Sequence, residues 1–279
     1  MSSPNSGINT GYTSYPAQAI MAFIILIILH FVMFGSEYMY RLISGVNKTQ
    51  TDLIPFTAGS AKMYTFSQDP SDGNSKSVYL SDNERTGAEF SYSFFVYVEQ
   101  ATFGNEDGLK HVFHKGYGCQ YPLLGPGVYM HNNRNTMRVY MNTFAGWNKH
   151  VDIENFPVNK WVHVVLMCED NGMNVFINGN IAKRINFEKS VPYQNFQSIH
   201  VFSQRRITVN GNLISSLNGE SFNVFGSISG SISLLTYYNY ALSYTEINEI
   251  LNNGPSKKTD PTVQDKPPYL ADDWWITSQ

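Results

Sequence analysis

Apolar residues follow two different patterns along this chain, and the first is a continuous run near the N-terminus. Ala17–Phe34 contains only two polar side chains, Gln18 and His30, and residues 1–36 contain no Asp, Glu, Lys or Arg. As a helix, this stretch spans roughly 27 Å, close to the hydrocarbon thickness of a bilayer. Helices buried in a soluble core usually keep a polar face, whereas Ile20–Leu29 is apolar all round. The run therefore predicts a transmembrane helix.

The sequence around this run favours an uncleaved anchor over a secretory signal peptide. The 16 residues before it carry no basic side chain, and FGSEYMYRL after it is a poor cleavage site. N-myristoylation is excluded because Ser2, not glycine, follows Met1. Arg41 and Lys48 follow the span, so the positive-inside rule predicts a cytoplasmic C-terminal part. The predicted anchor positions are Ala17, Ile20, Phe23, Ile27, Phe31 and Phe34.

The second pattern has a period of two and predicts β-strands. In Phe90–Val98 both faces are apolar, which is typical of a central strand. Pro126-Gly127 predicts a turn before a hairpin, and a three-stranded meander follows the hairpin. The remaining expected strands are His111–Lys115, Val128–His131, Thr136–Thr143, Trp161–Met167, Asn174–Ile177 and Ile181–Phe187.

The last part of the period-two region is less uniform. Residues 204–223 predict a long loop or an inserted hairpin. Gly226–Tyr238 alternates again, with Ile228, Ile232 and Leu234 expected to point inward and the intervening serines outward. Ser243-Tyr244-Thr245-Glu246 is a capping box that predicts a short helix, which Asn253-Gly254-Pro255 ends.

Composition agrees with an all-β domain. Aromatic residues make up 14% of the chain and charged residues 15%, and the 21 glycines indicate many turns. The formal net charge of −3 provides no basic field for a nucleic-acid partner. Cys119 and Cys168 have no metal-binding spacing, and two cysteines indicate a reducing compartment.

Several segments together resemble the laminin-G-like branch of the concanavalin A-like lectin/glucanase family. They are EFSYSFFVYV, HVFHKG, FPVNKWVHVVLMCEDNGMNVFINGNIAKRINF and FGSISGSISLLTYYNYALSYTEINEIL, which fall in this order within Val78–Leu251. The resemblance implies a two-sheet antiparallel jelly-roll sandwich, here with one N-terminal transmembrane helix and a short C-terminal helix. We expect domain limits at 1–16 (polar tail), 17–36 (transmembrane helix), 37–60 (stalk), 61–254 (jelly roll) and 255–279 (extended tail).

The residues predict no catalytic site and no metal or cofactor. Glucan-cleaving members of the superfamily carry an E-x-D-x-x-E strand, which is missing here, and Glu106-Asp107 and Glu169-Asp170 fall on expected turns. His111 and His114 are three apart on an expected strand, so we expect them to face opposite sheet surfaces. His163 is expected to be a hydrogen-bonded core or edge histidine. No calcium-binding cluster carries over from the family.

Sugar binding is a second possible function of such a domain. Asn132–Asn135 and Gly146–Asn148 have the composition of a lectin rim, although ordinary turns share that composition and are favoured. A membrane-anchored, carbohydrate-binding lectin is therefore the alternative function.

The whole architecture resembles membrane-associated virion proteins of large nucleocytoplasmic DNA viruses. This resemblance implies a minor capsid protein in the virion, anchored by a single pass in the internal membrane, with the major capsid protein or neighbouring minor proteins as partners. The C-terminal tail is either a docking peptide or a segment that folds back on its own domain. The candidate docking residues are Tyr269, Leu270, Asp272, Asp273, Trp274 and Trp275, with Arg205 and Arg206 as a weaker second contact.

Overall fold

The computed structural model describes residues 15–46, 49–73, 75–81, 88–169, 171–188, 190–212 and 219–261. The chain divides into two compact units, residues 1–48 and residues 49–279. The predicted docking residues of the tail, from Tyr269 to Trp275, lie outside the described residues.

The first unit contains one long helix, α1 (Tyr15–Val46). Its segment Gln18–Ser36 has a mean hydropathy of 2.5, and none of this segment is buried inside the protein. A helix of this length and composition can serve as a membrane anchor or as a signal sequence. The helix continues ten residues past Ser36, so the first part of the predicted stalk is helical.

The second unit is a sandwich of two β-sheets, which confirms the predicted jelly-roll architecture. Its first sheet has six antiparallel strands. In spatial order they are β1 (Gln50–Gly59), β14 (Gly230–Tyr238), β3 (Phe90–Val98), β8 (Trp161–Glu169), β9 (Gly172–Ile177) and β10 (Asn180–Asn186). β3 is an interior strand, and β8, β9 and β10 form the predicted meander.

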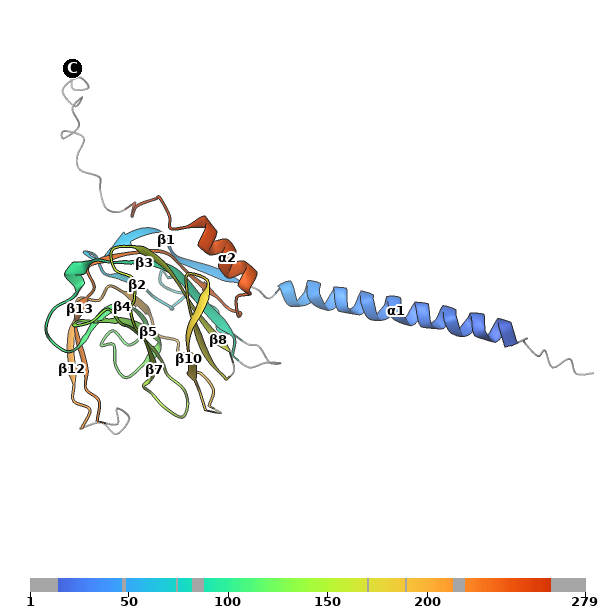
Figure 1. Ribbon diagram of the computed structural model, residues 1–279, viewed down its shortest axis with the longest axis horizontal. Helices are drawn as coiled ribbons and strands as arrows, with labels where there is room; N and C mark the ends of the chain where they lie inside the picture. Colours follow the sequence, from blue (N-terminus) through green and yellow to red (C-terminus); the bar gives the residue numbers. More distant parts are fainter. Residues whose placement is uncertain are drawn as a thin grey trace, which may run out of the picture. The chain divides into compact units, whose positions relative to one another are not determined.

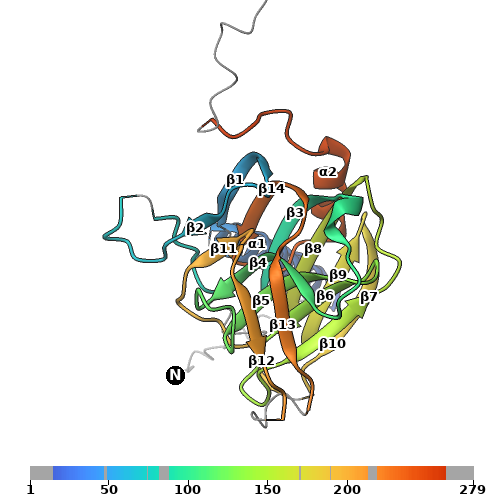
Figure 2. The same ribbon diagram turned by 90° about the vertical axis from the view of Figure 1, so that its left-hand side faces the viewer.

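The second sheet lies on the left in Figure 1 and faces the viewer in Figure 2. Its main path is β12 (Arg206–Val209), β13 (Phe222–Ser227), β4 (Leu109–Gly116), β5 (Leu124–His131), β6 (Met137–Met141) and β7 (Lys149–Ile153). β11 (Ile199–Val201) pairs with β4 and with β2 (Tyr64–Phe66). The pairing of β13 with β4 is parallel, and the other pairings of this sheet are antiparallel.

Aromatic side chains from both sheets meet in the core between them. Phe113 of β4 contacts Tyr92 and Phe94 of β3, with ring centroids 5.7 and 5.1 Å apart. A smaller cluster on the outer face of the first sheet packs under α2 (Tyr244–Asn253), where Ile247 is fully buried. The predicted capping box is confirmed, because Ser243 and Glu246 each bond the other's backbone N–H. A 3-10 turn, η1 (Gln100–Thr102), follows β3.

Three expectations about local structure need correction, and one open alternative is decided. Gln50–Gly59, placed in the stalk from sequence, is edge strand β1 and contributes Leu53 and Ile54 to the core. Pro126-Gly127, expected as a turn, lies inside β5. Residues 204–223 contain β12 and the start of β13, so the inserted-hairpin alternative holds there.

The third correction concerns β14, where the inward alternation stops after Ile232. The pairing with β3 shifts register between Ser233 and Thr236, and Leu234 has a positive φ of 51°. As a result Ser233 and Leu235 are fully buried while Leu234 is only partly buried. A bulge exchanges the faces of all later residues.

Candidate functional site

The outer face of the second sheet carries charged and aromatic side chains over the strands β5, β6 and β7. In β6, Met137, Val139 and Met141 enter the core, so Arg138 and Tyr140 point to the opposite face. The antiparallel register then sets Arg138 opposite Asp152 and Tyr140 opposite His150 of β7.

Arg138 and Asp152 form a two-pronged ion pair on this face. The Nε and Nη2 atoms of Arg138 donate to the two Asp152 oxygens at 2.6 and 2.7 Å. His131 and Arg134 also approach this carboxylate, at 3.5 and 3.7 Å. Burial alone raises the pKa of the Asp152 carboxyl, but hydrogen bonds from Arg138 and His131, with their charges, outweigh burial and hold that pKa well below its ordinary value.

An aromatic cluster supports the ion pair from below. Tyr129, Tyr140 and Phe222 contact one another edge to face, with centroid separations of 5.6 to 5.7 Å. The Arg138 guanidinium carbon lies 5.9 Å from the centre of the Tyr140 ring. Because rigid rings are packed underneath, the charged groups above them have little freedom to move.

Two adjoining hollows open over these residues, and Arg134 lines both. We call the first the polar groove; its volume is about 490 Å³, and its lining includes Asp107, His131, Arg134, Arg138, Glu220 and Asn223. The second, of about 600 Å³, is lined by Arg134, Asn135, Thr136, Asp152, Glu154 and Asn155.

Two buried polar atoms in the polar groove have no hydrogen-bond partner among the described residues. They are Nδ1 of His131, a residue that is only 4% exposed, and Oδ1 of Asn223. A buried polar atom without a partner costs free energy, so such atoms favour a ligand or an ordered water that pairs with them. This observation makes the polar groove the candidate binding site.

The charges of the two hollows favour some ligands over others. Four carboxylates (Asp107, Asp152, Glu154 and Glu220) face two guanidinium groups (Arg134 and Arg138). The excess of negative charge disfavours anionic ligands and suits uncharged or cationic ones that carry many hydrogen-bonding groups.

A buried chain of histidines lies on the same side of the second sheet, where His111 contacts Tyr129. Here the prediction that His111 and His114 face opposite surfaces is wrong. Nε2 of His111 lies 2.7 Å from Nδ1 of His114. The register of β4 against β5 shifts between His111 and Phe113, and Val112 and Phe113 both enter the core. This bulge returns His114 to the face of His111.

The hydrogen bonds of this chain have one consistent direction. The Ser203 backbone N–H donates to Nδ1 of His111, so the proton of His111 is on Nε2 and donates to His114. Nε2 of His114 in turn donates to the Tyr117 carbonyl at 2.8 Å. His200 stacks on His114 with ring centroids 5.0 Å apart. We call His111, His114 and His200 the histidine relay.

Burial keeps the histidine relay uncharged. Desolvation lowers the pKa of His114 to about 3 and that of His111 well below its ordinary value. The nearby His200 lowers the pKa of both rings further, and His114 does so for His111. Hydrogen bonds occupy all four ring nitrogens of His111 and His114, so neither ring has a free lone pair for a metal. Within the described residues, no group of three or more His, Cys, Asp or Glu is arranged to hold a metal ion.

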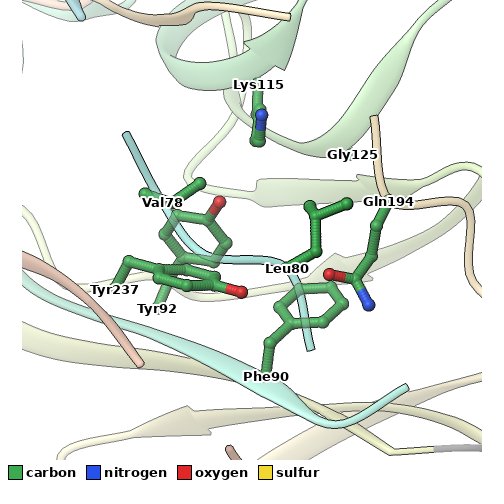
Figure 3. A pocket seen from close by; sticks show the side chains of 8 residues that line it. All are labelled: Val78, Leu80, Phe90, Tyr92, Lys115, Gly125, Gln194 and Tyr237. Atoms are coloured by element: carbon green, nitrogen blue, oxygen red, sulfur yellow. The ribbon is translucent and has the colours of Figure 1, made fainter. Parts of the chain in front are cut away.

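A small cavity lies between the sheets near β4. Figure 3 shows Lys115 above the rings of Tyr92, Tyr237 and Phe90 that line it. Its volume is about 10 Å³, which is room for about one water molecule. Lys115 donates to the Gln197 carbonyl at 2.8 Å, and burial lowers the pKa of its ammonium group to about 7. The cavity is too small for an organic ligand.

The residues named from sequence lie at separate places. Ile20, Phe23, Ile27, Phe31 and Phe34 are exposed on α1, which also contains Ala17. Arg205 and Arg206 are exposed at the start of β12, where Arg205 donates to the Gly118 carbonyl at 3.3 Å. The loop Asn132–Asn135 borders the polar groove, whereas Gly146–Asn148 follows the opposite end of β6.

His163 is a buried core histidine, as predicted, and its Nε2 lies 2.9 Å from the Ser93 hydroxyl. Sequence reasoning missed His131, Arg138, Asp152 and Asn223. The alternation of Met137–Met141 was a usable signal for Arg138, but its pairing with Asp152 depends on the register of the β6–β7 hairpin.

The family model of the concanavalin A-like lectin/glucanases superfamily matches residues 72–248, which is more than half of the chain. The chain belongs to this superfamily. No curated protein matches the chain in sequence. The family's fold is a lectin-like sandwich, and the resemblance stated from sequence is confirmed at this level.

Solved structures that are similar to this chain include two of botulinum neurotoxin D. The serotype D ligand-binding domain in complex with N-acetylneuraminic acid is 14% identical, with a TM-score of 0.44, over 61% of this chain and 38% of that one. The receptor-binding domain of botulinum neurotoxin D is 14% identical, with a TM-score of 0.46, over 75% and 48%.

A Trypanosoma rangeli sialidase is 15% identical, with a TM-score of 0.40, over 58% of this chain and 22% of that one. This chain covers less than half the length of each of these three structures. Identities this low say nothing about what this chain binds.

Proposed function

We propose that the protein is a membrane-anchored minor capsid protein of a large DNA virus, which links an internal membrane to the outer capsid shell. The observation that carries the proposal is the joining of α1 to a lectin-like sandwich. Gln18–Ser36 is charge-free and none of it is buried inside the protein, while the described core of the sandwich begins only at Leu53. A chain built in this way holds a binding domain at a lipid surface, and the resemblance to virion membrane proteins supplies the setting.

The test is fractionation of purified virus particles. After the outer shell is stripped, the wild-type protein is expected to stay with the internal membrane through alkaline extraction. Ile24→Lys together with Ile27→Lys should release it, because each charge costs about 3 kcal/mol at the centre of a membrane helix. Ile181→Lys, an exposed position on β10, is the matched control and should leave the protein bound. Absence of the protein from the particles contradicts the proposal.

The orientation of the anchor is part of the same proposal. Arg41 and Lys48 support a C-terminal domain on the cytoplasmic, capsid-facing side. In intact membranes from producing cells, protease added from the cytoplasmic side should digest a tag at the C-terminus and spare a tag at the N-terminus. Protection of the C-terminal tag reverses the orientation.

Docking to neighbouring capsid proteins is proposed for the tail residues Tyr269, Leu270, Asp272, Asp273, Trp274 and Trp275. Deletion of residues 267–279 should weaken retention on the shell without changing membrane extraction. Unchanged shell association removes the tail from the proposal. Arg205→Ala with Arg206→Ala tests the second contact in the same assay.

We also propose, as a second candidate function, that the polar groove binds glycans. It is favoured by the unpaired His131 Nδ1 and Asn223 Oδ1, because sugar hydroxyls can both donate and accept hydrogen bonds. The excess of carboxylates predicts uncharged glycans rather than sialylated ones.

The full chain in detergent micelles, applied to a glycan array, should bind neutral glycans, and Asn223→Ala should weaken this binding at least tenfold. Asn252→Ala on α2 is the control. No signal above background at high protein concentration contradicts this function.

The same geometry supports binding without catalysis. Glycoside hydrolysis needs a carboxylic acid whose pKa is close to the working pH. Asp152 has a lowered pKa and stays ionised beside Arg138, so it cannot act as that acid near neutral pH. Release of reducing sugar from a glucan by the purified chain would overturn this part of the proposal.

A further inference from the structure

Two loops at one end of the sandwich present exposed aromatic side chains. Phe144 is 72% exposed, Trp147 43%, Val191 44% and Phe196 75%. Tyr193 joins the loops, since its ring centroid lies 5.1 Å from that of Phe144 and 6.0 Å from that of Trp147. We call these five residues the aromatic patch. Large apolar side chains gathered in this way are costly in water and mark a surface that contacts a partner.

The two loops are tied together through their backbones. The N–H of Phe144 donates to the Val191 carbonyl at 3.1 Å, and the N–H of Tyr193 donates to the Asn142 carbonyl at 2.9 Å. The hydroxyl of Ser190 accepts from the N–H of Ala145 at 2.9 Å. The aromatic patch is therefore a preformed surface, and little conformational entropy is lost when it contacts a partner.

The aromatic patch lies at the end of the sandwich where the chain arrives from α1. Gln50 pairs with Tyr238, and Tyr238 pairs with Ser91 at the start of β3, so these residues share one end of the first sheet. The Tyr237 hydroxyl donates to the Tyr79 carbonyl at this end. Two residues beyond Tyr79, the N–H of Ser81 donates to the Gln194 side chain at 3.0 Å. Gln194 directly follows Tyr193, so these contacts connect the aromatic patch to the Gln50 end of the first sheet.

The chain between the apolar helix segment and the sandwich is short. Thirteen residues separate Ser36 from Gln50, and α1 includes the first ten of them. At about 1.5 Å per helical residue and at most about 3.6 Å per extended residue, β1 begins within roughly 30 Å of Ser36. A bilayer that holds Gln18–Ser36 is therefore within reach of loops at the Gln50 end of the sandwich.

The chemistry of the aromatic patch fits a membrane interface. Tyr and Trp concentrate at the headgroup level of bilayers, where an apolar ring and a polar edge are both accommodated. The neighbouring Lys149 is paired with Glu188 at 3.0 Å, so the border of the aromatic patch carries balanced charge. We infer that the aromatic patch inserts into the headgroup region of the bilayer that holds α1 and so fixes the tilt of the sandwich. This inference rests on the proposed anchoring by α1.

Site-specific labelling of the full chain in lipid nanodiscs tests the inference. A Cys119→Ser background removes the exposed thiol, and Cys168 is buried. Phe144→Cys, Phe196→Cys and, as the matched control, Ile181→Cys each receive an environment-sensitive fluorophore. Ile181 is 50% exposed and lies near the start of β10, whereas the 190–196 loop follows the strand's other end. Ile27→Cys reports whether α1 is inserted.

Headgroup-attached nitroxide lipids should quench the labels at Phe144 and Phe196 several times more strongly than the label at Ile181. Iodide in the aqueous phase should quench the labels at Phe144 and Phe196 less than the label at Ile181. If all three labels on the sandwich respond equally while the Ile27 label is protected in the bilayer, the inference fails and the anchor stands. If the Ile27 label is also open to iodide, the anchor itself fails. Shielding of Phe144 and Phe196 from iodide without lipid quenching indicates a second copy or a glycan on the aromatic patch and also overturns the inference.

Discussion

Nε2 of His111 lies 2.7 Å from Nδ1 of His114, although the two residues are three apart on one strand. Both rings are buried and uncharged, and the bonds around them leave no acceptor for an added proton. The relay therefore couples the stability of the second sheet to pH.

Acid is expected to destabilise the domain progressively below about pH 6.5, the ordinary pKa of histidine in an unfolded chain. Burial lowers the folded-state pKa of His111, His114, His200 and His163, to about 3 for His114 and about 4 for His163. The unfolded chain then binds more protons than the folded one between these values, so stability falls as pH falls. Each histidine that is neutral when folded and protonated when unfolded adds about 1.4 kcal/mol per pH unit to the slope of the unfolding free energy against pH. Urea unfolding at pH 7.5, 6.5 and 5.5 measures the slope.

A variant isolates the relay's share of this slope. The charged and titratable groups near it are Lys115 on β4, Tyr129 on β5 and Arg205 after β11. His200→Gln should reduce the slope by up to about 1.4 kcal/mol per pH unit, because it removes one of the groups whose pKa is lowered in the folded state. His150→Gln, outside the relay, is the control. A slope unchanged by His200→Gln contradicts the account.

Replacing Lys115 by Met is expected to stabilise the protein at pH 7 by about 2 kcal/mol. Its buried ammonium group has no carboxylate partner among the residues that the structure describes, and such a group is costly. In the folded state its pKa is about 7, against about 10.5 when unfolded, so wild-type stability should rise from pH 7 to pH 10. Lys115→Met should remove this rise, whereas Lys160→Met at an exposed site should keep it. A less stable Lys115→Met with the same rise would contradict this expectation.

Breaking the Arg138–Asp152 pair from one side is expected to be costly. Asp152→Ala leaves the half-buried Arg138 guanidinium without its carboxylate and should lower the free energy of unfolding by about 3 kcal/mol. Glu169→Ala removes the partner of Arg184 in an exposed pair with a 3.5 Å separation and should cost less than about 1 kcal/mol. Equal losses in chemical denaturation would show that the Arg138–Asp152 pair has no special role.

Gly230 at the start of β14 is expected to tolerate no side chain. Its φ is +151°, and a Cβ there would lie 1.9 Å from the Tyr97 carbonyl oxygen. Gly230→Ala should therefore cost about 3 kcal/mol or prevent folding. Gly59→Ala, where a Cβ meets nothing within 4 Å, is the matched control and should change stability by less than about 0.5 kcal/mol. Thermal unfolding of both variants compares them, and equal melting temperatures would contradict the prediction.

The sequence by itself determined the features that depend on neighbouring residues. The charge-free run in α1 predicted a long apolar helix, the alternation in Phe90–Val98 predicted a two-sided strand, and Ser243 with Glu246 predicted the start of α2. Helix length, strand period and capping are local properties, because hydrogen bonds and side-chain directions within a few residues produce them.

Only the tertiary structure decided where the polar side chains converge. Bulges at Val112 and near Leu234 change which face the nearby residues point to, so period-two reasoning misplaced His114 and Leu234. The polar groove depends on the pairing of Arg138 with Asp152 and on the arrival of Asn223 from a distant hairpin. Such contacts follow from strand register between segments far apart in the chain, and no local pattern of hydrophobic and polar residues specifies that register.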